Sequence, residues 1–204
     1  MPDLTTDNPA PPSSNQIKSQ LRKDLRLRRQ QLDTGVQQNA AQAVARFSAQ
    51  LPAWSRARRV ALYLAQNGEV DTTILAQACR DRGIELFLPV INDDNSLGFA
   101  RWLETQSLRA NRYAIPEPPP DSPRCPVSSL DYLFIPLLAW DCKGTRLGMG
   151  GGYYDRTLEG VSGPRLVGLG HSFQEVPELP REPWDVPLEF VITEAALHSL
   201  PVIA

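Results

Sequence analysis

From Arg59 onward, short apolar runs alternate with segments of helical periodicity, and no other feature constrains the fold of this chain as strongly. Short apolar runs bounded by turn residues are typical of strands buried on both faces. Strands that alternate with helices form parallel sheets, because parallel neighbours need a crossover connection. The pattern predicts a three-layer α/β/α fold of Rossmann-like type, with a mostly parallel open sheet.

About six strands are expected in this sheet. They read VALYLA (60–65), IELFLPV (84–90), LGFARWL (97–103), DYLFIPLLAW (131–140), RLVGLG (165–170) and EFVITE (189–194). The proline-rich stretch 116–126 predicts an extended connection, because proline removes a backbone donor.

Helices are expected before and between the strands. Two precede the sheet: one carries Ile17, Leu21, Leu25 and Leu32 at helical spacing, and a second runs from about Val36 to Leu51, where Pro52 ends it. After the first strand, Asp71 is expected to cap a helix that continues to about Arg82. Its expected inward residues are Ile74, Leu75 and Ala78.

Composition limits the domain count and the class of protein. The first 16 residues hold four prolines and no basic residue, so we expect a disordered tail over 1–16 and a single domain over 17–204. A net charge of −2 argues against nucleic acid as a partner. No apolar stretch reaches the roughly 20 residues that cross a bilayer, so no membrane partner is expected. Three cysteines without CxxC spacing suit a reducing cytoplasm.

The run RLGMGGGYYDR at 146–156 is the main chemical signal. Glycines let backbone N–H groups approach an anion closely and tolerate positive φ. A short helix is expected from Tyr153 to Leu158, so the loop would lie at its N-terminus. Arg146 suits phosphate oxygens, and Asp155 suits the magnesium that accompanies a nucleoside triphosphate. A plain glycine-rich turn is the competing interpretation, and the residue types favour a phosphate cradle over it.

Other polar residues cluster at positions where a ligand is expected. In open α/β sheets ligands bind beyond the carboxyl ends of the strands. Asn67, Gly68 and Glu69 follow the first strand, Asp141 and the glycine run follow the fourth, and His171 and Gln174 follow the fifth. Lys18, Arg22, Arg26 and Arg29 form a basic face on the first helix, which composition alone assigns to solvent.

The ordered part of the chain resembles the 5-formyltetrahydrofolate cyclo-ligase family, also called 5,10-methenyltetrahydrofolate synthetases. The likeness covers almost all of 18–194. Its segments are KSQLRKDLRLRRQQL (18–32), NGEVDT (67–72), YAIPEP (113–118), PLLAWDCKGTRLGMGGGYYDR (136–156) and WDVPLEFVITE (184–194). The resemblance implies a cytoplasmic, ATP- and Mg²⁺-dependent ligase of one-carbon metabolism, which converts 5-formyltetrahydrofolate to 5,10-methenyltetrahydrofolate and releases ADP and phosphate. We expect it to act as a monomer.

The resemblance also implies a role for each matching residue. Lys18 and Arg22 match ATP contacts, which favours a binding role for the basic face over a merely solvated one. The phosphate-binding segment corresponds to Arg146, Gly148, Met149, Gly150, Gly151, Gly152, Tyr153 and Tyr154. Asp155 and Asp185 match positions associated with magnesium. Leu64, Glu69 and Tyr153 match folate contacts, and Arg146 and Tyr153 are the expected catalytic residues.

One departure from the family stands in the loop itself, where Met149 replaces a basic or aromatic residue. We expect backbone amides, Arg146 and magnesium to stabilise the transferred phosphate without it. His171 and Trp102 are expected to be structural. Three other classes stay open from the residues: a sugar-phosphate isomerase or CoA-transferase-like enzyme, a non-catalytic nucleotide-binding regulator, and a nucleic-acid-binding module that uses the first helix.

Overall fold

An eight-stranded sheet forms the centre of the computed structural model, which describes residues 11–201. Its order is β12-β11-β10-β7-β1-β2-β3-β6. The strands are β1 (Arg59–Ala61), β2 (Glu85–Ile91), β3 (Leu97–Arg101), β6 (Arg124–Cys125), β7 (Tyr132–Pro136), β10 (Arg165–Leu169), β11 (Phe190–Ile192) and β12 (Leu197–Ser199). The five strands from β11 to β2 run parallel, whereas β3, β6 and β12 pair antiparallel at the edges. The predicted α/β class with a mostly parallel sheet is confirmed.

Alternate residues of the central strands supply two separate cores. On β7, Tyr132 and Phe134 face one core while Leu133 and Ile135 face the other, and all four are buried. Val60 and Ala61 of β1 divide in the same way. Both faces of the sheet are therefore apolar, which explains why the strands read as continuous apolar runs.

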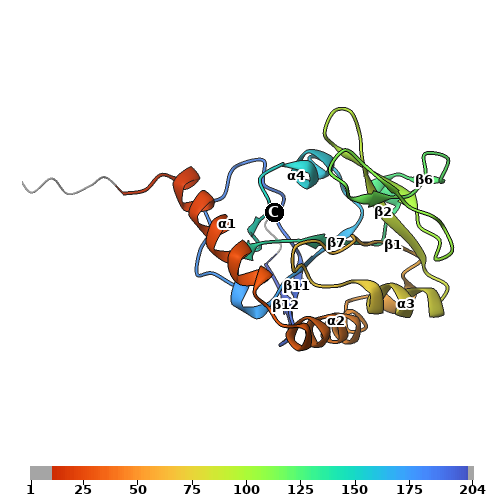
Figure 1. Cartoon of the computed structure of the whole chain (residues 1–204), viewed down its shortest axis with the longest axis horizontal. Coiled ribbons are helices and arrows are strands. Elements are labelled where there is room, and N and C mark those ends of the chain that lie inside the picture. Colours follow the sequence, from red (N-terminus) through yellow and green to blue (C-terminus); the bar gives the residue numbers. More distant parts are fainter. Residues whose placement is uncertain (1–10, 202–204) are drawn as a thin grey trace, which may run out of the picture.

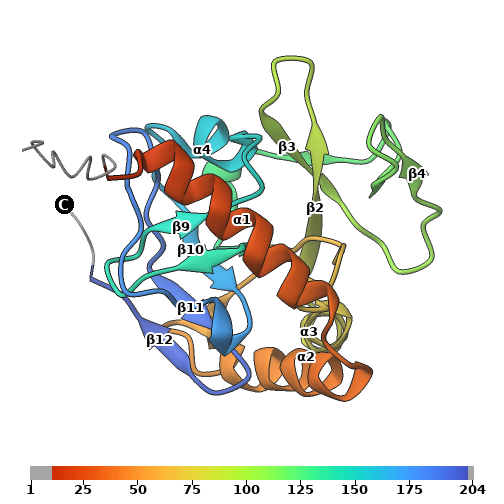
Figure 2. The ribbon, with the colours of Figure 1, turned by 60° about the vertical axis from the view of Figure 1, so that its left-hand side comes forward.

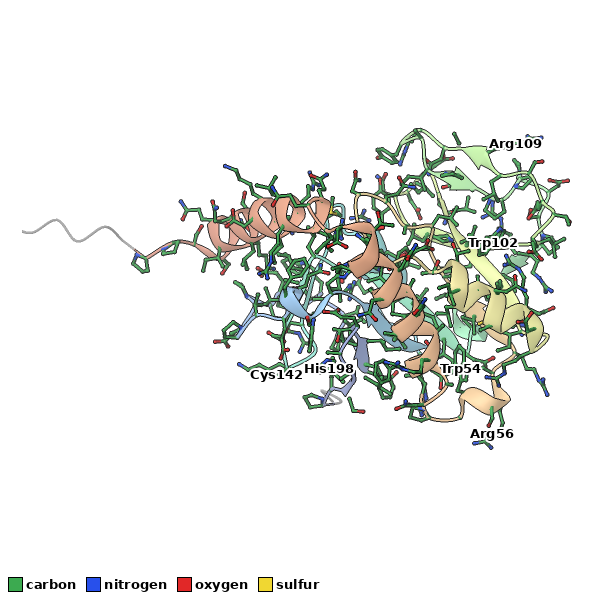
Figure 3. The ribbon with its side chains drawn as sticks, turned by 60° about the horizontal axis from the view of Figure 1, so that its bottom comes forward. Trp54, Arg56, Trp102, Arg109, Cys142 and His198 are labelled. Carbon is green, nitrogen blue, oxygen red and sulfur yellow. The ribbon has the colours of Figure 1, made fainter. Side chains whose placement is uncertain are left out.

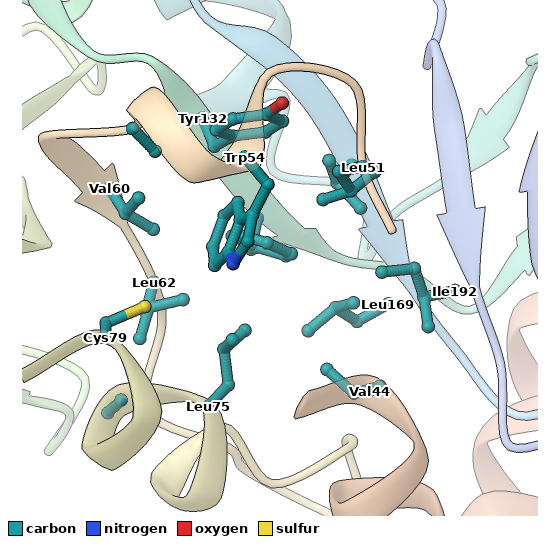
Figure 4. Packing of buried hydrophobic residues seen from close by; sticks show 14 of the residues in the cluster. Val44, Leu51, Trp54, Val60, Leu62, Leu75, Cys79, Tyr132, Leu169 and Ile192 are labelled. Atoms are coloured by element: carbon teal, nitrogen blue, oxygen red, sulfur yellow. The ribbon is translucent and has the colours of Figure 1, made fainter. Parts of the chain in front are cut away.

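Helices cover the two faces of the sheet (Figure 1). One face is covered by α2 (Thr34–Ser48) and α3 (Thr73–Asp81), and α4 (Tyr153–Leu158) lies on the other. Beneath α2 and α3, Trp54 of the 3₁₀ helix η1 (Trp54–Arg56) fills the centre of the core, surrounded by Val44, Leu75 and Ile192 (Figure 4). Its ring meets that of Tyr132 edge-on, with centroids 5.1 Å apart.

The first helix, α1 (Ser14–Gln30), lies apart from this packing and crosses the molecule from the α4 side toward α2 (Figure 2). Only Leu25 and Arg29 of its residues are buried. It begins three residues before the predicted start, because Ser13 and Gln16 form a capping box. In this box the side chain of each residue accepts a hydrogen bond from the backbone N–H of the other. Positions 14–16 of the predicted tail are thus helical, and residues 1–10 lie outside the described residues.

Two small hairpins border the functional region. One pairs β4 (Arg109–Ala110) with β5 (Pro116–Glu117), and the other pairs β8 (Ala139–Trp140) with β9 (Arg146–Leu147). The 3₁₀ helices η2 (Val127–Ser129) and η3 (Ser172–Gln174) complete the connections. The prediction that 116–126 is an extended connection without regular structure is wrong in part, because the stretch contributes β5 and β6 to sheets and turns between them, where the Ser122 amide donates to the Pro119 carbonyl.

Two details of the predicted elements are wrong. In α3 the buried residues are Leu75, Ala76 and Cys79, whereas Ile74 is 40% exposed, so the inward face is turned from the one expected. The sheet has eight strands where about six were expected. Trp102 packs against the core beside α3 (Figure 3). The Arg80 guanidinium lies 4.4 Å from its ring centroid, in agreement with a structural role. Within residues 11–201, no helix is long and apolar enough to span a membrane.

Candidate functional site

A cleft of about 920 Å³ opens at the carboxyl ends of β1 and β7, between α1, α4 and the β4–β5 hairpin. All the residues that the sequence assigned to the site line this one cleft: Lys18, Arg22, Leu64, Glu69, Arg146, Gly148, Met149, Gly150, Gly151, Gly152, Tyr153, Tyr154, Asp155 and Asp185. They come from six segments between α1 and the 182–185 turn. The fold thus brings together residues that are up to 167 positions apart.

The glycine run forms a loop from β9 into α4. Gly150 and Gly152 have φ of +99° and +67°, a region that side chains rarely adopt. A Cβ on Gly151 would lie 2.7 Å from the Tyr153 ring, so a larger residue there would displace this ring. Gly148 has open space around it, which leaves its backbone accessible from the cleft. The glycines therefore serve both the curvature of the loop and close approach to it.

The basic face of α1 lies against this loop. Arg22 Nε donates to the Gly148 carbonyl at 3.0 Å. Its guanidinium carbon lies 3.5 Å from the position that a Cβ on Gly150 would occupy. Arg26 Nη2 lies 3.7 Å from the Met149 sulfur. The prediction from composition alone that this basic face is solvated is therefore wrong for Arg22, which donates to the loop, and for Arg29, which is buried.

Carboxylates and cations alternate on the side of the cleft formed by α1 and the 182–185 turn. Lys18 Nζ lies 3.5 Å from both Glu182 Oε1 and Asp185 Oδ2. Arg146 Nη2 donates to Asp155 Oδ1 at 2.6 Å, and its Nη1 donates to the Val186 carbonyl. The Arg146 side chain is only 5% exposed, so it holds Asp155 in place rather than standing free for a phosphate.

Asp155 retains an oxygen for a ligand. Its Oδ1 accepts from Arg146 and, at 3.4 Å, from the Val186 amide, while no described residue donates to Oδ2. Asp185 Oδ2 accepts from the Glu182 amide at 2.8 Å. Within residues 11–201, no group of three or more acidic, cysteine or histidine side chains forms a metal cage. This donor set fits magnesium that is held chiefly by phosphates and water, which needs only one or two carboxylates.

The opposite side of the cleft is more apolar and contains buried ionisable groups. Glu69 is 11% exposed, and its Oε2 accepts from the Gln66 amide at 3.0 Å. Burial raises the pKa of Glu69, whereas the Gln66 hydrogen bond and the charge of Arg29 lower it. Burial also raises the pKa of Tyr63 and Tyr154, so both phenols stay neutral at neutral pH. Leu64 is half-buried in the same wall.

A pair of tyrosines joins the β4–β5 hairpin to α4 across the cleft. The hydroxyl groups of Tyr113 and Tyr153 are 2.7 Å apart. This hydrogen bond lowers the pKa of Tyr153 and raises that of Tyr113, and either hydroxyl can donate to the other. Glu117 fixes the hairpin by accepting from the Ile91 amide and from Asn111. Tyr113 and the 61% exposed Trp184 are cleft residues that sequence reasoning left without a role.

Three other polar residues predicted at this sheet edge serve the framework. Asp141 is buried and accepts from the amides of Lys143, Thr145 and Leu179. Gln174 donates to the carbonyls of Leu137 and Leu138. His171 is buried beside the Gly68 carbonyl, and the burial lowers its pKa. None of the three lines the cleft, so the structural assignment of His171 agrees with its position.

Comparison with known proteins relates this cleft to a family of enzymes. The model of the 5-formyltetrahydrofolate cyclo-ligase family matches residues 14–194. A 5-formyltetrahydrofolate cyclo-ligase of Haemophilus influenzae is 37% identical over 180 residues, which cover 86% of this chain and 96% of the relative. One from Escherichia coli K12 is 38% identical over 174 residues, covering 83% and 96%. The structure of Aquifex aeolicus 5,10-methenyltetrahydrofolate synthetase superposes with a TM-score of 0.80 at 33% identity, covering 92% and 95%.

Proposed function

Because the chain belongs to the 5-formyltetrahydrofolate cyclo-ligase family, we propose that its cleft binds ATP and 5-formyltetrahydrofolate together, with the glycine loop between them. The enzyme closes 5-formyltetrahydrofolate to 5,10-methenyltetrahydrofolate at the expense of ATP. Family membership favours this ligase over the isomerase, CoA-transferase, regulator and nucleic-acid-binding alternatives. The observation that carries the proposed placement is that residues suited to phosphates and residues suited to a pterin line a single cleft.

The chemistry requires an activated formyl oxygen, because the oxygen of a formamide is a poor leaving group. The γ-phosphoryl group of ATP is transferred to this oxygen, with ADP as the leaving group. N10 then adds to the formyl carbon and loses its proton, and the C–O bond breaks to release phosphate. The protein's task in such a sequence is to position the two substrates and to stabilise developing charge.

We assign the phosphates to the loop and the basic face of α1. Gly148, Gly150 and Gly151 line the cleft and carry no side chains that would keep a phosphate away from the backbone, and Arg22 also lines the cleft, where it donates to the Gly148 carbonyl. Lys18 lies between the carboxylates of Glu182 and Asp185, and we expect its ammonium group to turn toward a phosphate when ATP brings negative charge into the cleft. Met149, Gly152 and Tyr154 complete the lining of this segment.

Magnesium, when bound, would neutralise phosphate charge during the transfer. Asp155 and Asp185 are the residues we assign to it, Asp155 through its unengaged Oδ2. Arg146 serves this assignment by fixing the orientation of Asp155, so its contribution to catalysis comes through the carboxylate as well as through its own charge.

The folate is assigned to the side of Leu64, Glu69 and Tyr153. A carboxylate such as Glu69 suits the donor-rich edge of a pterin. The Tyr153 hydroxyl is bonded to that of Tyr113 and also lines the cleft, and we assign it to the formyl group. Cytoplasmic location and a monomeric state remain predictions from the sequence.

Turnover of the purified protein tests the proposal directly. With 5-formyltetrahydrofolate, ATP and Mg²⁺, methenyltetrahydrofolate should accumulate, as followed by its absorbance, with one ADP released per product. Omission of Mg²⁺ should abolish the reaction, and ATP alone should give no ADP. Absence of product with all three present would reject the assignment.

A further inference from the structure

Arg29 is a fully buried arginine located behind the cleft. Its side chain is 1% exposed, although it belongs to α1, which has only one other buried residue. Arginine is almost never fully buried unless its charge is paired, because desolvating a guanidinium is costly. The partners of Arg29 should therefore indicate its purpose.

All the contacts of its guanidinium lie on the folate side of the cleft. Nε donates to the Asn67 carbonyl at 3.0 Å, and Nη1 donates to the Leu137 carbonyl at 3.1 Å. Nη2 lies 3.7 Å from Glu69 Oε1 and has no hydrogen-bond partner among the described residues. The fork thus ties the loop after β1 to the end of β7, and its remaining nitrogen is directed at the carboxylate.

The loop that carries Glu69 is fitted closely to Arg29. Gly68 has φ of +77°, and a Cβ there would lie 2.5 Å from the Arg29 carbonyl oxygen, so only glycine fits. The Gly68 carbonyl accepts from Gln37 at 3.1 Å, and His171 Nε2 lies 3.3 Å from it. These contacts fix the loop at Gly68, and the loop in turn holds Glu69 at the wall of the cleft.

Arg29 is the buried cation that offsets the charge of Glu69. The other ionisable groups near this pair are Tyr63, after β1, and Tyr154, on α4, which face Glu69, and His171, after β10, which faces Arg29. Arg26, on α1, is a second cation whose charge acts on Arg29. Burial raises the pKa of both tyrosines and lowers that of His171, so all three are neutral at neutral pH. A pterin over Glu69 would exclude water and strengthen the need for the adjacent positive charge.

We propose that Arg29 is a positioning residue for the folate: it holds the loop of Glu69 and keeps this carboxylate ionised and aimed at the N–H groups of the pterin. The inference rests on the proposed placement of the pterin at Glu69. Arg29 touches neither substrate, so its effect should appear in the binding of folate and in the pH dependence of that binding, and not in the binding of ATP.

Arg29→Gln tests the charge. We expect the KM for 5-formyltetrahydrofolate to rise roughly tenfold or more at pH 7, equivalent to about 1.4 kcal/mol, because the variant leaves the Glu69 carboxylate without its adjacent buried cation. The KM for ATP should change little. Without Arg29, the raising effect of burial on the pKa of Glu69 is no longer offset by an adjacent cation. As the pH is lowered, Glu69 of the variant should therefore become protonated at a higher pH than Glu69 of the wild type. The folate KM of the variant should accordingly begin to rise at a higher pH than that of the wild type.

A double-mutant cycle with Glu69→Gln separates positioning from general stability. Glu69→Gln should raise the folate KM and remove its pH dependence, and adding Arg29→Gln to it should change the KM little further. Fully additive effects, or an Arg29→Gln profile equal to that of the wild type, would overturn the proposal. An unchanged folate KM in Glu69→Gln would instead reject the placement of the pterin, while turnover by the wild type would still support the activity.

Two further variants keep the test decisive. Arg80→Gln on α3 is the matched control, because Arg80 also has a buried Nη2 without a hydrogen-bond partner among residues 11–201 but packs on Trp102 outside the cleft. It should leave the folate KM unchanged. If Arg29→Gln does not fold, Arg29→Lys takes its place in the cycle: it keeps the charge but cannot hold both carbonyls, so the folate KM should rise without a shift of its pH profile. A KM equal to that of the wild type would overturn the proposal.

Discussion

Met149 stands at the centre of the phosphate loop without a charge of its own. The side chain is 44% exposed, and the Arg26 guanidinium reaches its sulfur. A cation is therefore already present beside the position that the family often fills with a basic residue. The structure adds this reason to the expectation that the loop works without a charge at residue 149.

Met149→Arg should consequently give little gain. We expect kcat to change by less than about fivefold, because charge interactions at exposed sites are worth about 1 kcal/mol or less and Arg26 would repel the new cation. The measurement is kcat at saturating substrates, with Met149→Leu as the control for shape. A large increase in turnover with an unchanged folate KM would contradict this expectation, because it would mean that the loop needs a positive charge at residue 149 and that Arg26 does not supply it.

Arg146 and Asp155 should act as one unit at the phosphates. Asp155→Asn keeps the size of the side chain but removes the charge assigned to magnesium, and Arg146→Ala releases the carboxylate. Each should lower kcat by roughly 100-fold or more, the scale of a lost electrostatic contact in a transition state. The thermal unfolding midpoint should move far less than activity does.

The matched control for this pair is Arg165, which bonds Glu189 at 3.2 Å outside the cleft and is 41% exposed. Arg165→Ala should leave kcat unchanged, since exposed ion pairs contribute little. If either Arg146→Ala or Asp155→Asn kept full activity, its assigned role would be wrong.

At the scale of elements, α1 depends on a small apolar contact to present its basic face. Leu25 is 8% exposed and packs with Ala139, Leu147 and Leu179, next to the strand that leads into the glycine loop. Leu25→Ala should cost about 2–3 kcal/mol of unfolding free energy, as for other buried leucines. It should also raise the KM for ATP, because Lys18 and Arg22 lie on the same helix.

Leu27→Ala provides the control, since Leu27 is 56% exposed on the same helix. Neither stability, measured by denaturant unfolding, nor the KM for ATP should change. A loss of ATP affinity in Leu27→Ala equal to that in Leu25→Ala would show that docking of α1 through Leu25 does not control the site.

The central elements were predictable because their burial is uniform. Strands such as β7 are apolar on both faces and leave a continuous signal. β6 and β12 were missed because two or three residues paired at a sheet edge carry no periodicity. The face of α3 was misjudged because Ile74 and Leu75 are adjacent, and only the packing of the helix decides which of them points inward.

At the scale of the whole molecule, the residues that line the cleft were predictable and their contacts were not. Glycine, arginine and aspartate at fixed spacing predict a phosphate loop, and the family pattern adds Leu64 and Glu69. Tyr113 and Arg29 gain their positions from long-range contacts, with Tyr153 and with the loop after β1 respectively. A lone tyrosine in a proline-containing segment, or one arginine among six basic residues, carries no such information in the sequence.

The position of α1 across the cleft predicts how the protein responds to its substrates. Lys18 contacts the 182–185 turn, Arg22 the glycine loop and Arg29 the loop of Glu69, so one helix borders both proposed subsites. Its apolar anchoring is limited to a small cluster, whereas the strands of the sheet are buried on both faces. Local opening of α1 should therefore cost less free energy than opening of the sheet.

Hydrogen exchange of the backbone amides tests this difference. A non-hydrolysable ATP analogue with Mg²⁺ should slow exchange in α1 and the glycine loop, and added 5-formyltetrahydrofolate should slow it further near Arg29 and the loop after β1. Amides of β7 and β10, already protected by the sheet, should change little. Because α1 contacts both subsites, each ligand should also strengthen the binding of the other. Protection confined to the sheet, or ATP affinity that is independent of folate, would show that α1 does not connect the two subsites.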